Sequence, residues 1–156
     1  MDLLRNVSRG GSWPIEGEVF FPLFDRYIRF VVDDEAELDY VERCGRFLAD
    51  LPSSVTEALC KASIRYCHAF QQTIGEAPTP FLDPRDVLKL VSPSALIVPN
   101  PPLDNEPALC MELNCEWEPE HGMEWVVRGD NVLYVGAYQG TDPWADFPDE
   151  ASWNYG

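Results

Sequence analysis

The chain is short of basic residues: its 156 residues include 11 Lys and Arg against 27 Asp and Glu, a net charge of −16. So acidic a chain repels phosphates, which excludes nucleic-acid-binding modules as a function class. Long apolar runs are also missing, because residues 19–24 and 94–98 fall far short of the roughly 20 residues of a membrane helix. No basic segment followed by an apolar stretch opens the sequence, so we expect a soluble, cytoplasmic protein without a membrane partner.

Histidine is scarce, which limits the catalytic chemistry that the chain can carry. His68 and His121 are the only two, and neither has a Ser or Cys nucleophile at the spacing of a known motif. There is no Gly-rich phosphate loop and no Ser-His-Asp order. We therefore expect a protein that is not an enzyme and that needs no cofactor.

The cysteines do not form a disulfide or metal-ligand pattern. There are five, an odd number at loose spacings, which is typical of reduced, buried thiols in a cytosolic protein. Cys110, Cys115 and His121 are conceivable zinc ligands, but positions 110 and 115 face opposite ways on a strand. We expect no metal site.

Apolar residues are plentiful enough for a packed core. Hydrophobic residues make up 46% of the chain and aromatic residues 12%, which excludes intrinsic disorder. A chain of this length is expected to form a single domain over 1–156. The Pro-rich residues 99–107 then form an ordered loop, because the 49 residues after them are few for an independent unit.

The N-terminal half predicts a strand pair followed by helices. Residues 15–21 and 27–32 are rich in β-branched and aromatic types. The acidic residues 33–35 open a helix that Pro52 ends, and Ser54 with Glu57 predicts a capping box at the start of a second helix running to about residue 73. The apolar faces of the two helices are expected to be Tyr40, Val41, Cys44, Phe47, Leu48 and Leu51, then Val55, Leu59, Ala62, Tyr66 and Phe70.

The next segments predict a short helix and a buried strand. Gly75 is a plausible stop for the second helix, and Asp83 with Pro84 begins a short third one. Pro93 ends that helix, and residues 95–98 form the strand.

The C-terminal part alternates with period two, as expected for a three-stranded antiparallel meander. Residues 109–117 form the first strand, residues 119–122 turn the chain, and 123–127 and 132–135 form the other two. The tripeptide Arg128-Gly129-Asp130 is expected to form a turn and to have no further role. The predicted fold class is therefore α+β, with an irregular, acidic, Trp-bearing tail over 140–156.

The negative charge is concentrated in the last third of the chain. Residues 1–100 hold 10 basic and 15 acidic residues, whereas residues 101–156 hold 12 acidic residues and one basic residue, Arg128. Four of the five Trp lie there as well, of which Trp117 and Trp125 fit core positions on strands better than Trp144 and Trp153 do. Carboxylates mixed with large aromatic side chains suit a basic protein partner.

One local feature suggests chemistry. Glu120 beside His121 could act as a general acid and base in a cleft. The alternative, which we favour, is a histidine that hydrogen-bonds the turn while Gly122 takes a conformation closed to other residues.

Residues 115–125 and 132–136 resemble the C-terminal signature of a small bacterial family of unknown function, in which a Trp-acid-x-Glu-His-Gly turn precedes a Gly-ended hairpin. The resemblance is close over roughly residues 110–138. It implies that Trp117, Glu120, His121, Gly122 and Gly136 are signature positions. Some members of that family are associated with polymorphic toxin systems as cytoplasmic immunity proteins.

Together these observations predict a non-enzymatic, acidic protein-binding domain of the immunity type, which neutralises a basic toxin or another basic protein. The alternative is a small enzyme or ligand-binding protein that uses Glu120 and His121. The sequence leaves the oligomeric state open. The residues expected to contact the basic partner are Glu116, Glu118, Glu120, Glu124, Asp142, Trp144 and Asp146.

Overall fold

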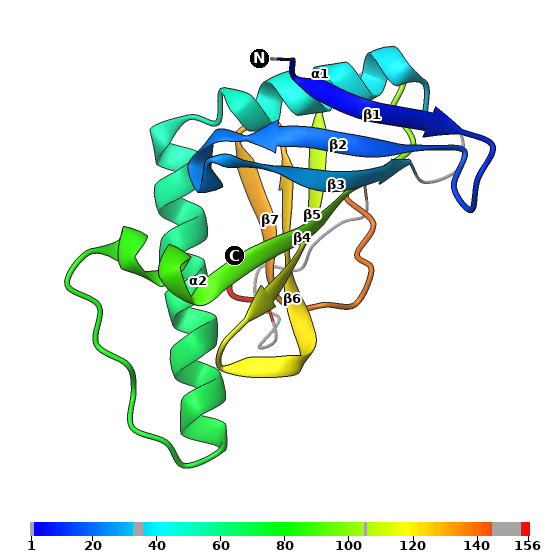
Figure 1. The fold of residues 1–156 in the computed structure, drawn as a ribbon. Coiled ribbons are helices and arrows are strands. Elements are labelled where there is room, and N and C mark those ends of the chain that lie inside the picture. Colours follow the sequence, from blue (N-terminus) through cyan, green and yellow to red (C-terminus); the bar gives the residue numbers. More distant parts are fainter. Residues whose placement is uncertain (1, 33–35, 105, 145–153) are drawn as a thin grey trace.

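A computed structural model describes residues 2–32, 36–104, 106–144 and 154–156. Within them lies one seven-stranded sheet whose spatial order follows the chain, β1-β2-β3-β4-β5-β6-β7 (Figure 1). Each strand therefore lies beside the strand that precedes it in the sequence. The strands are Leu4–Arg9, Ile15–Phe21, Arg26–Val32, Val91–Val98, Ala108–Cys115, Glu118–Arg128 and Asn131–Ala137.

One parallel pairing divides this sheet into two antiparallel parts. The strands β1, β2 and β3 pair antiparallel, as do β4, β5, β6 and β7. Between the two parts, β3 and β4 run parallel, which requires a crossover connection. That connection contains the helices α1, Leu38–Ala49, and α2, Ser53–Thr73, and the 3₁₀ helix η2, Pro84–Leu90. A shorter 3₁₀ helix, η1 (Pro22–Phe24), joins β2 to β3.

The helices follow the predicted pattern except at their starts. Residues 33–35, which were expected to open the first helix, lie outside the described residues, and α1 begins at Leu38 with Glu37 as its N-cap. The α1 helix buries Tyr40, Val41, Cys44 and Leu48, as its spacing predicts. The capping box expected at Ser54 is wrong: α2 begins at Ser53 with Pro52 as its N-cap, and no side chain caps it. The stop of α2 and the start of η2 are better matched, because Gly75 has a φ of +76° and Asp83 with Asp86 forms a capping box.

The α+β class is confirmed, but the predicted sheet was too small. The sequence predicted neither β1 nor the union of all strands in one sheet. Pro93 does not end a helix but lies inside β4, where the register with β5 shifts between Pro93 and Ala95. A proline, which has no N–H to donate, is tolerated in a strand at such an irregularity.

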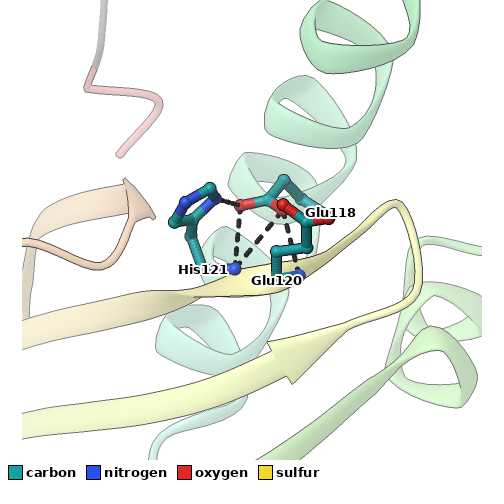
Figure 2. Close-up of side chains that lie close together, drawn as sticks. All are labelled: Glu118, Glu120 and His121. Carbon is teal, nitrogen blue, oxygen red and sulfur yellow. Dashed lines mark hydrogen bonds and ion pairs between the residues drawn. The ribbon is translucent and has the colours of Figure 1, made fainter.

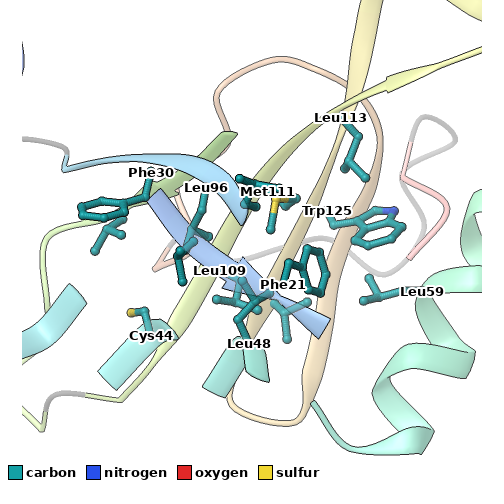
Figure 3. Close-up of a cluster of buried hydrophobic side chains, with 14 of the residues drawn as sticks. Phe21, Phe30, Cys44, Leu48, Leu59, Leu96, Leu109, Met111, Leu113 and Trp125 are labelled. Carbon is teal, nitrogen blue, oxygen red and sulfur yellow. The ribbon is translucent and has the colours of Figure 1, made fainter. Parts of the chain in front are cut away.

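The main core lies between the helices and one face of the sheet (Figure 3). Phe21, Phe30 and Leu96 from the strands meet Leu48 and Leu59 from the helices, and all five are 2% exposed or less. Trp125 of β6 is also buried, and its indole Nε1 donates to Ser63 Oγ of α2 at 2.9 Å, so its polar atom is satisfied. No described helix is both long enough and apolar enough to cross a bilayer.

The opposite face of the sheet carries a second, smaller apolar cluster of Cys110, Val126 and Tyr134. At the sheet edge formed by β7, residues 154–156 lie alongside the strand: the side-chain amide of Asn154 accepts from the backbone of Val135 and donates to that of Leu133. The backbone N–H of Tyr155 also donates to Val135. Described residues at the C-terminal end thus cover backbone groups that an edge strand leaves unpaired.

Candidate functional site

The Trp117–Gly122 segment, which carried the family resemblance, forms a bulge at the start of β6. Cys115 of β5 pairs with Glu118, whereas Leu113, two residues earlier, pairs with Met123. The four residues 119–122 of β6 therefore face a single residue of β5, Asn114, and the hairpin turn lies at 116–117. The turn predicted at 119–122 is in the wrong place, because the alternation was extended two residues too far along β5.

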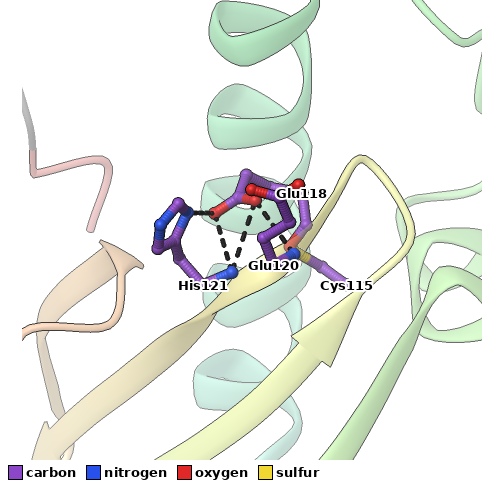
Figure 4. A network of polar contacts seen from close by, with 4 residues as sticks. All are labelled: Cys115, Glu118, Glu120 and His121. Atoms are coloured by element: carbon purple, nitrogen blue, oxygen red, sulfur yellow. Dashed lines mark hydrogen bonds and ion pairs between the residues drawn. The ribbon is translucent and has the colours of Figure 1, made fainter.

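The bulge is closed by the carboxylate of Glu118 (Figure 2). It accepts hydrogen bonds from the backbone N–H of Glu120 at 3.1 Å and from that of His121 at 3.2 and 3.3 Å. The Nδ1 of His121 lies 2.9 Å from the same carboxylate. The backbone carbonyl of Glu118 in turn accepts from the thiol of Cys115 (Figure 4). Glu118 is 9% exposed, so a buried acid organises the whole bulge.

Gly122 allows the chain to return to the sheet after the bulge. Its φ is +74°, and a Cβ at this position would lie 2.8 Å from the carbonyl oxygen of Leu113. Only glycine combines that φ with so close an approach of a neighbouring strand. The expectation that Gly122 takes a conformation closed to other residues is confirmed.

His121 is a surface side chain held by one partner. Three quarters of it is exposed, and its partner is Glu118, not the adjacent Glu120 that the sequence suggested. A neutral ring that donates from Nδ1 keeps its lone pair on Nε2, the form in which histidine acts as a base or a ligand. The signal that sequence reasoning missed is the acid three residues before the histidine, which a bulge brings beneath the ring.

The same three residues are a conceivable metal-binding group. One ligand atom from each of Glu118, Glu120 and His121 lies within 4.8 Å of the other two. The Glu118 carboxylate, however, already serves three donors, and an ion would have to compete with them. The zinc set considered from the sequence is not formed, because Cys115 lies in the main core and Cys110 in the cluster on the opposite face.

The residues expected to contact a partner divide into exposed and buried ones. Glu116, Glu120 and Asp142 are exposed. Trp144 is half-buried, and its indole Nε1 donates to the carbonyl of Asn100 at 2.8 Å. Asp146, like Trp153, lies outside the described residues.

Glu118 and Glu124 differ from the exposed members of this set, because both are buried in the folded chain. Glu124, on β6, is 2% exposed. Its carboxylate accepts from both the hydroxyl and the backbone N–H of Thr141, and the backbone of Gln139 and Gly140 also stabilises its charge. Burial nevertheless raises the pKa of Glu124 above the usual value of a glutamate.

The two remaining signature positions, Trp117 and Gly136, are packed against other parts of the fold. Trp117 is half-buried and meets the ring of Tyr66 edge to face, with 5.7 Å between centroids. Gly136 is buried in β7 directly opposite Glu124.

Surface charge differs between the two parts of the chain in how it is compensated. Among the described residues, every ion pair of Lys or Arg with a carboxylate involves acids of the first 100 residues. These pairs are Arg5–Glu18, Arg29–Glu16, Arg46–Glu42, Lys61–Glu57 and Lys89–Asp86. Arg128, the one basic residue of the last third, donates instead to the carbonyl of Pro143 at 2.9 Å.

A comparison with protein families finds a match over residues 3–143, to a family described as a domain of unknown function (DUF6985). The match covers most of the chain, including all seven strands. No curated protein and no solved structure matches the chain.

Proposed function

The chain belongs to the DUF6985 family, and from that premise we propose that it is a non-enzymatic, acidic protein-binding domain that neutralises a basic protein, as immunity proteins do. The family description assigns no activity. The proposal therefore depends on the surface of this chain and on the resemblance to a family of which some members are associated with toxin systems.

The observation that carries the proposal is the uncompensated charge of the last third. Glu116 and Glu120 are exposed, Glu112 is partly exposed, and all three lie on β5, the β5–β6 turn or the bulge. Five acids of the first 100 residues form ion pairs with Lys or Arg, whereas these three form none with any described Lys or Arg. An acidic surface without internal cations attracts a basic partner over distances of about a Debye length, roughly 10 Å at 0.1 M salt.

Such a surface makes a specific kinetic prediction. Electrostatic steering acts mainly on the association rate, which falls as salt screens the field. The dissociation rate depends more on contacts made after docking. The proposal thus requires a partner whose association slows with added salt.

The test is a pull-down from the native cell with a charge-reversed variant and a matched control. The variant Glu112→Lys, Glu116→Lys, Glu120→Lys changes the net charge by the same amount as the control Asp39→Lys, Glu42→Lys, Glu57→Lys on the helices. We expect a basic protein to be captured by the wild type and by the control and lost from the variant. The captured basic protein should lose its own activity when the wild-type chain is added.

Two results would contradict the proposal. If both triple variants lose the partner equally, total charge and not the C-terminal surface is responsible. An association rate that is the same at 50 and 500 mM NaCl would exclude steering.

A second candidate, an enzyme, is favoured by one contact, the 2.9 Å pair of His121 Nδ1 and Glu118. In this alternative Glu118 orients the ring and Glu120 and His121 exchange protons with a substrate. Three quarters of the His121 side chain is exposed to solvent, so we rank this candidate second. A substrate whose turnover is abolished by His121→Ala, while binding of basic proteins is unchanged, would reverse the ranking.

A further inference from the structure

A pocket of about 490 Å³ lies on the face of the sheet away from the helices. It is bounded by β4, β5 and β6, by the loop after β1 and by the segment after β7. We call it the aromatic pocket and define it by Trp13, Tyr138, Trp144, Ile97, Cys110 and Glu124. Its size lies within the range of small-ligand sites, about 300–1,000 Å³.

The walls of the aromatic pocket are aromatic residues from two segments, Trp13 after β1 and Tyr138 and Trp144 after β7. Trp13 and Tyr138 are 36% and 38% exposed, and exposed apolar surface gathered at one place often marks an interaction site. The ring of Trp144 is held by its hydrogen bond to Asn100, so this wall keeps a fixed orientation. Aromatic faces carry negative partial charge and attract cations placed over them.

The acidic side chains of the pocket also favour a cation. Among the described residues that line it, the two carboxylates are Glu124 and Asp142, and no Lys or Arg lines it. Arg128 bonds the backbone of Pro143 at the rim and is not among the lining residues. Perturbed acids in pockets often mark binding sites, and a bound cation would add to the hydrogen bonds that Glu124 receives from Thr141.

We propose that the aromatic pocket binds the guanidinium group of an arginine side chain presented by the basic partner. This inference rests on the proposed function and names the chemical group that the partner inserts. A guanidinium stacks on indole and phenol rings, is weakly hydrated and pairs with carboxylates, whereas a lysine ammonium is strongly hydrated and loses more on entering an apolar site. The exposed acids around the bulge then steer the partner, and the aromatic pocket holds one of its side chains.

The test uses small probes, so that it does not depend on finding the partner. N-acetyl-arginine methylamide is titrated into the full chain while the indole N–H signals are followed by NMR, with Trp13→Phe and Trp144→Phe used to assign them. N-acetyl-citrulline methylamide, which has the same shape without the charge, is the matched control. We expect shifts at Trp13 and Trp144 with the arginine probe and at least about tenfold weaker binding of the citrulline probe, equivalent to about 1.4 kcal/mol.

Variants locate the site and allow for failure to fold. Glu124→Gln is expected to weaken arginine binding about tenfold, and Glu57→Gln, which removes an equal charge on α2, should leave it unchanged. If Glu124→Gln does not fold, Trp13→Ala at its exposed position takes its place, with the same expected loss. Equal binding of the two probes, or arginine shifts that survive every pocket variant, would overturn the inference.

The source of the guanidinium is tested with a second pair of probes. A peptide with an internal arginine should bind at least as tightly as free methylguanidine. Much tighter binding of methylguanidine would assign the aromatic pocket to a small molecule and overturn a partner's arginine as its occupant. If the arginine probe binds but no charge-dependent partner exists, the proposed function fails while the chemistry of the pocket stands.

Discussion

Glu118 and Glu120 are two residues apart in the sequence, yet their carboxylates have opposite surroundings. Glu118 is buried and accepts from two backbone N–H groups and from His121, whereas Glu120 is exposed. Burial of an acid is compensated only when such donors are present, so the two glutamates contribute unequally to stability.

Replacing each of these glutamates by glutamine should separate their roles. Glu118→Gln is expected to lower the free energy of unfolding by about 1–3 kcal/mol, because charge-assisted bonds to the bulge are weakened. Glu120→Gln should change it by less than about 0.5 kcal/mol, as expected of a surface substitution. Urea denaturation measures both, and equal effects would contradict the organising role of Glu118.

Glu124 predicts a pH dependence of stability with a definite sign. Its pKa in the folded state is raised by burial above the usual 4.5, so the folded protein takes up the proton before the unfolded chain does. The contribution of Glu124 to stability is then fully present below the unfolded pKa and is lost as the pH rises through the folded pKa.

This dependence is measured against Glu124→Gln, which cannot ionise. Unfolding free energies are measured at several pH values between 4.5 and 7.5. As the pH falls, the stability of the wild type should rise relative to that of the variant. A gain in the opposite direction would mean that the donors at Gln139, Gly140 and Thr141 outweigh burial.

At the scale of elements, the bulge in β6 depends on one glycine, for which the chain offers a matched control. Gly75, after α2, has a φ of +76°, and a Cβ added there would meet nothing within 4 Å. Gly122 has a φ of +74°, and a Cβ added there would lie 2.8 Å from a carbonyl oxygen. The two sites share backbone strain and differ in steric contact.

Alanine at the two sites should therefore have different costs. Gly75→Ala is expected to destabilise by about 1–2 kcal/mol, the cost of the left-handed conformation. Gly122→Ala adds the clash with Leu113 and should cost about 1–3 kcal/mol more. Urea denaturation of both variants gives the difference, and equal costs would show that β5 moves aside freely.

Elements with a strong apolar period were predictable from the sequence, and those set by tertiary context were not. The burial of Tyr40 and Leu48 follows directly from their spacing in α1. The β1 strand, Leu4–Arg9, was not predicted, because it lies at the sheet edge with most of its side chains exposed and thus shows no alternation. Consecutive serines at 53 and 54 made the start of α2 ambiguous by one residue.

The candidate site was only partly predictable for a similar reason. The Glu-His-Gly segment and the glycine conformation were visible in the sequence, since a positive φ leaves a residue signature. The pairing of His121 with Glu118 depends on the bulge, and the burial of Glu124 depends on the segment after β7. Both features require contacts that no local pattern specifies.

At the scale of the whole molecule, a net charge of −16 opposes compaction through self-repulsion. Added NaCl should therefore raise the free energy of unfolding between about 10 and 200 mM, as screening shortens the range of repulsion. The variant Glu112→Gln, Glu116→Gln, Glu120→Gln should show a smaller salt response than wild type in urea denaturation. A matched variant of three paired acids, Glu16→Gln, Glu42→Gln, Glu57→Gln, should not, because those acids already face Arg29, Arg46 and Lys61.

The order of strands in the sheet also has a consequence for how the chain folds. Five of the six strand pairings join segments separated by short connections, and only β3 with β4 closes a long one, over residues 33–90. Contacts near in sequence form with little loss of chain entropy, whereas a long loop closes at greater cost. The two antiparallel parts of the sheet can thus nucleate independently. They then join through the parallel pairing of β3 residues 29–32 with β4 residues 95–98.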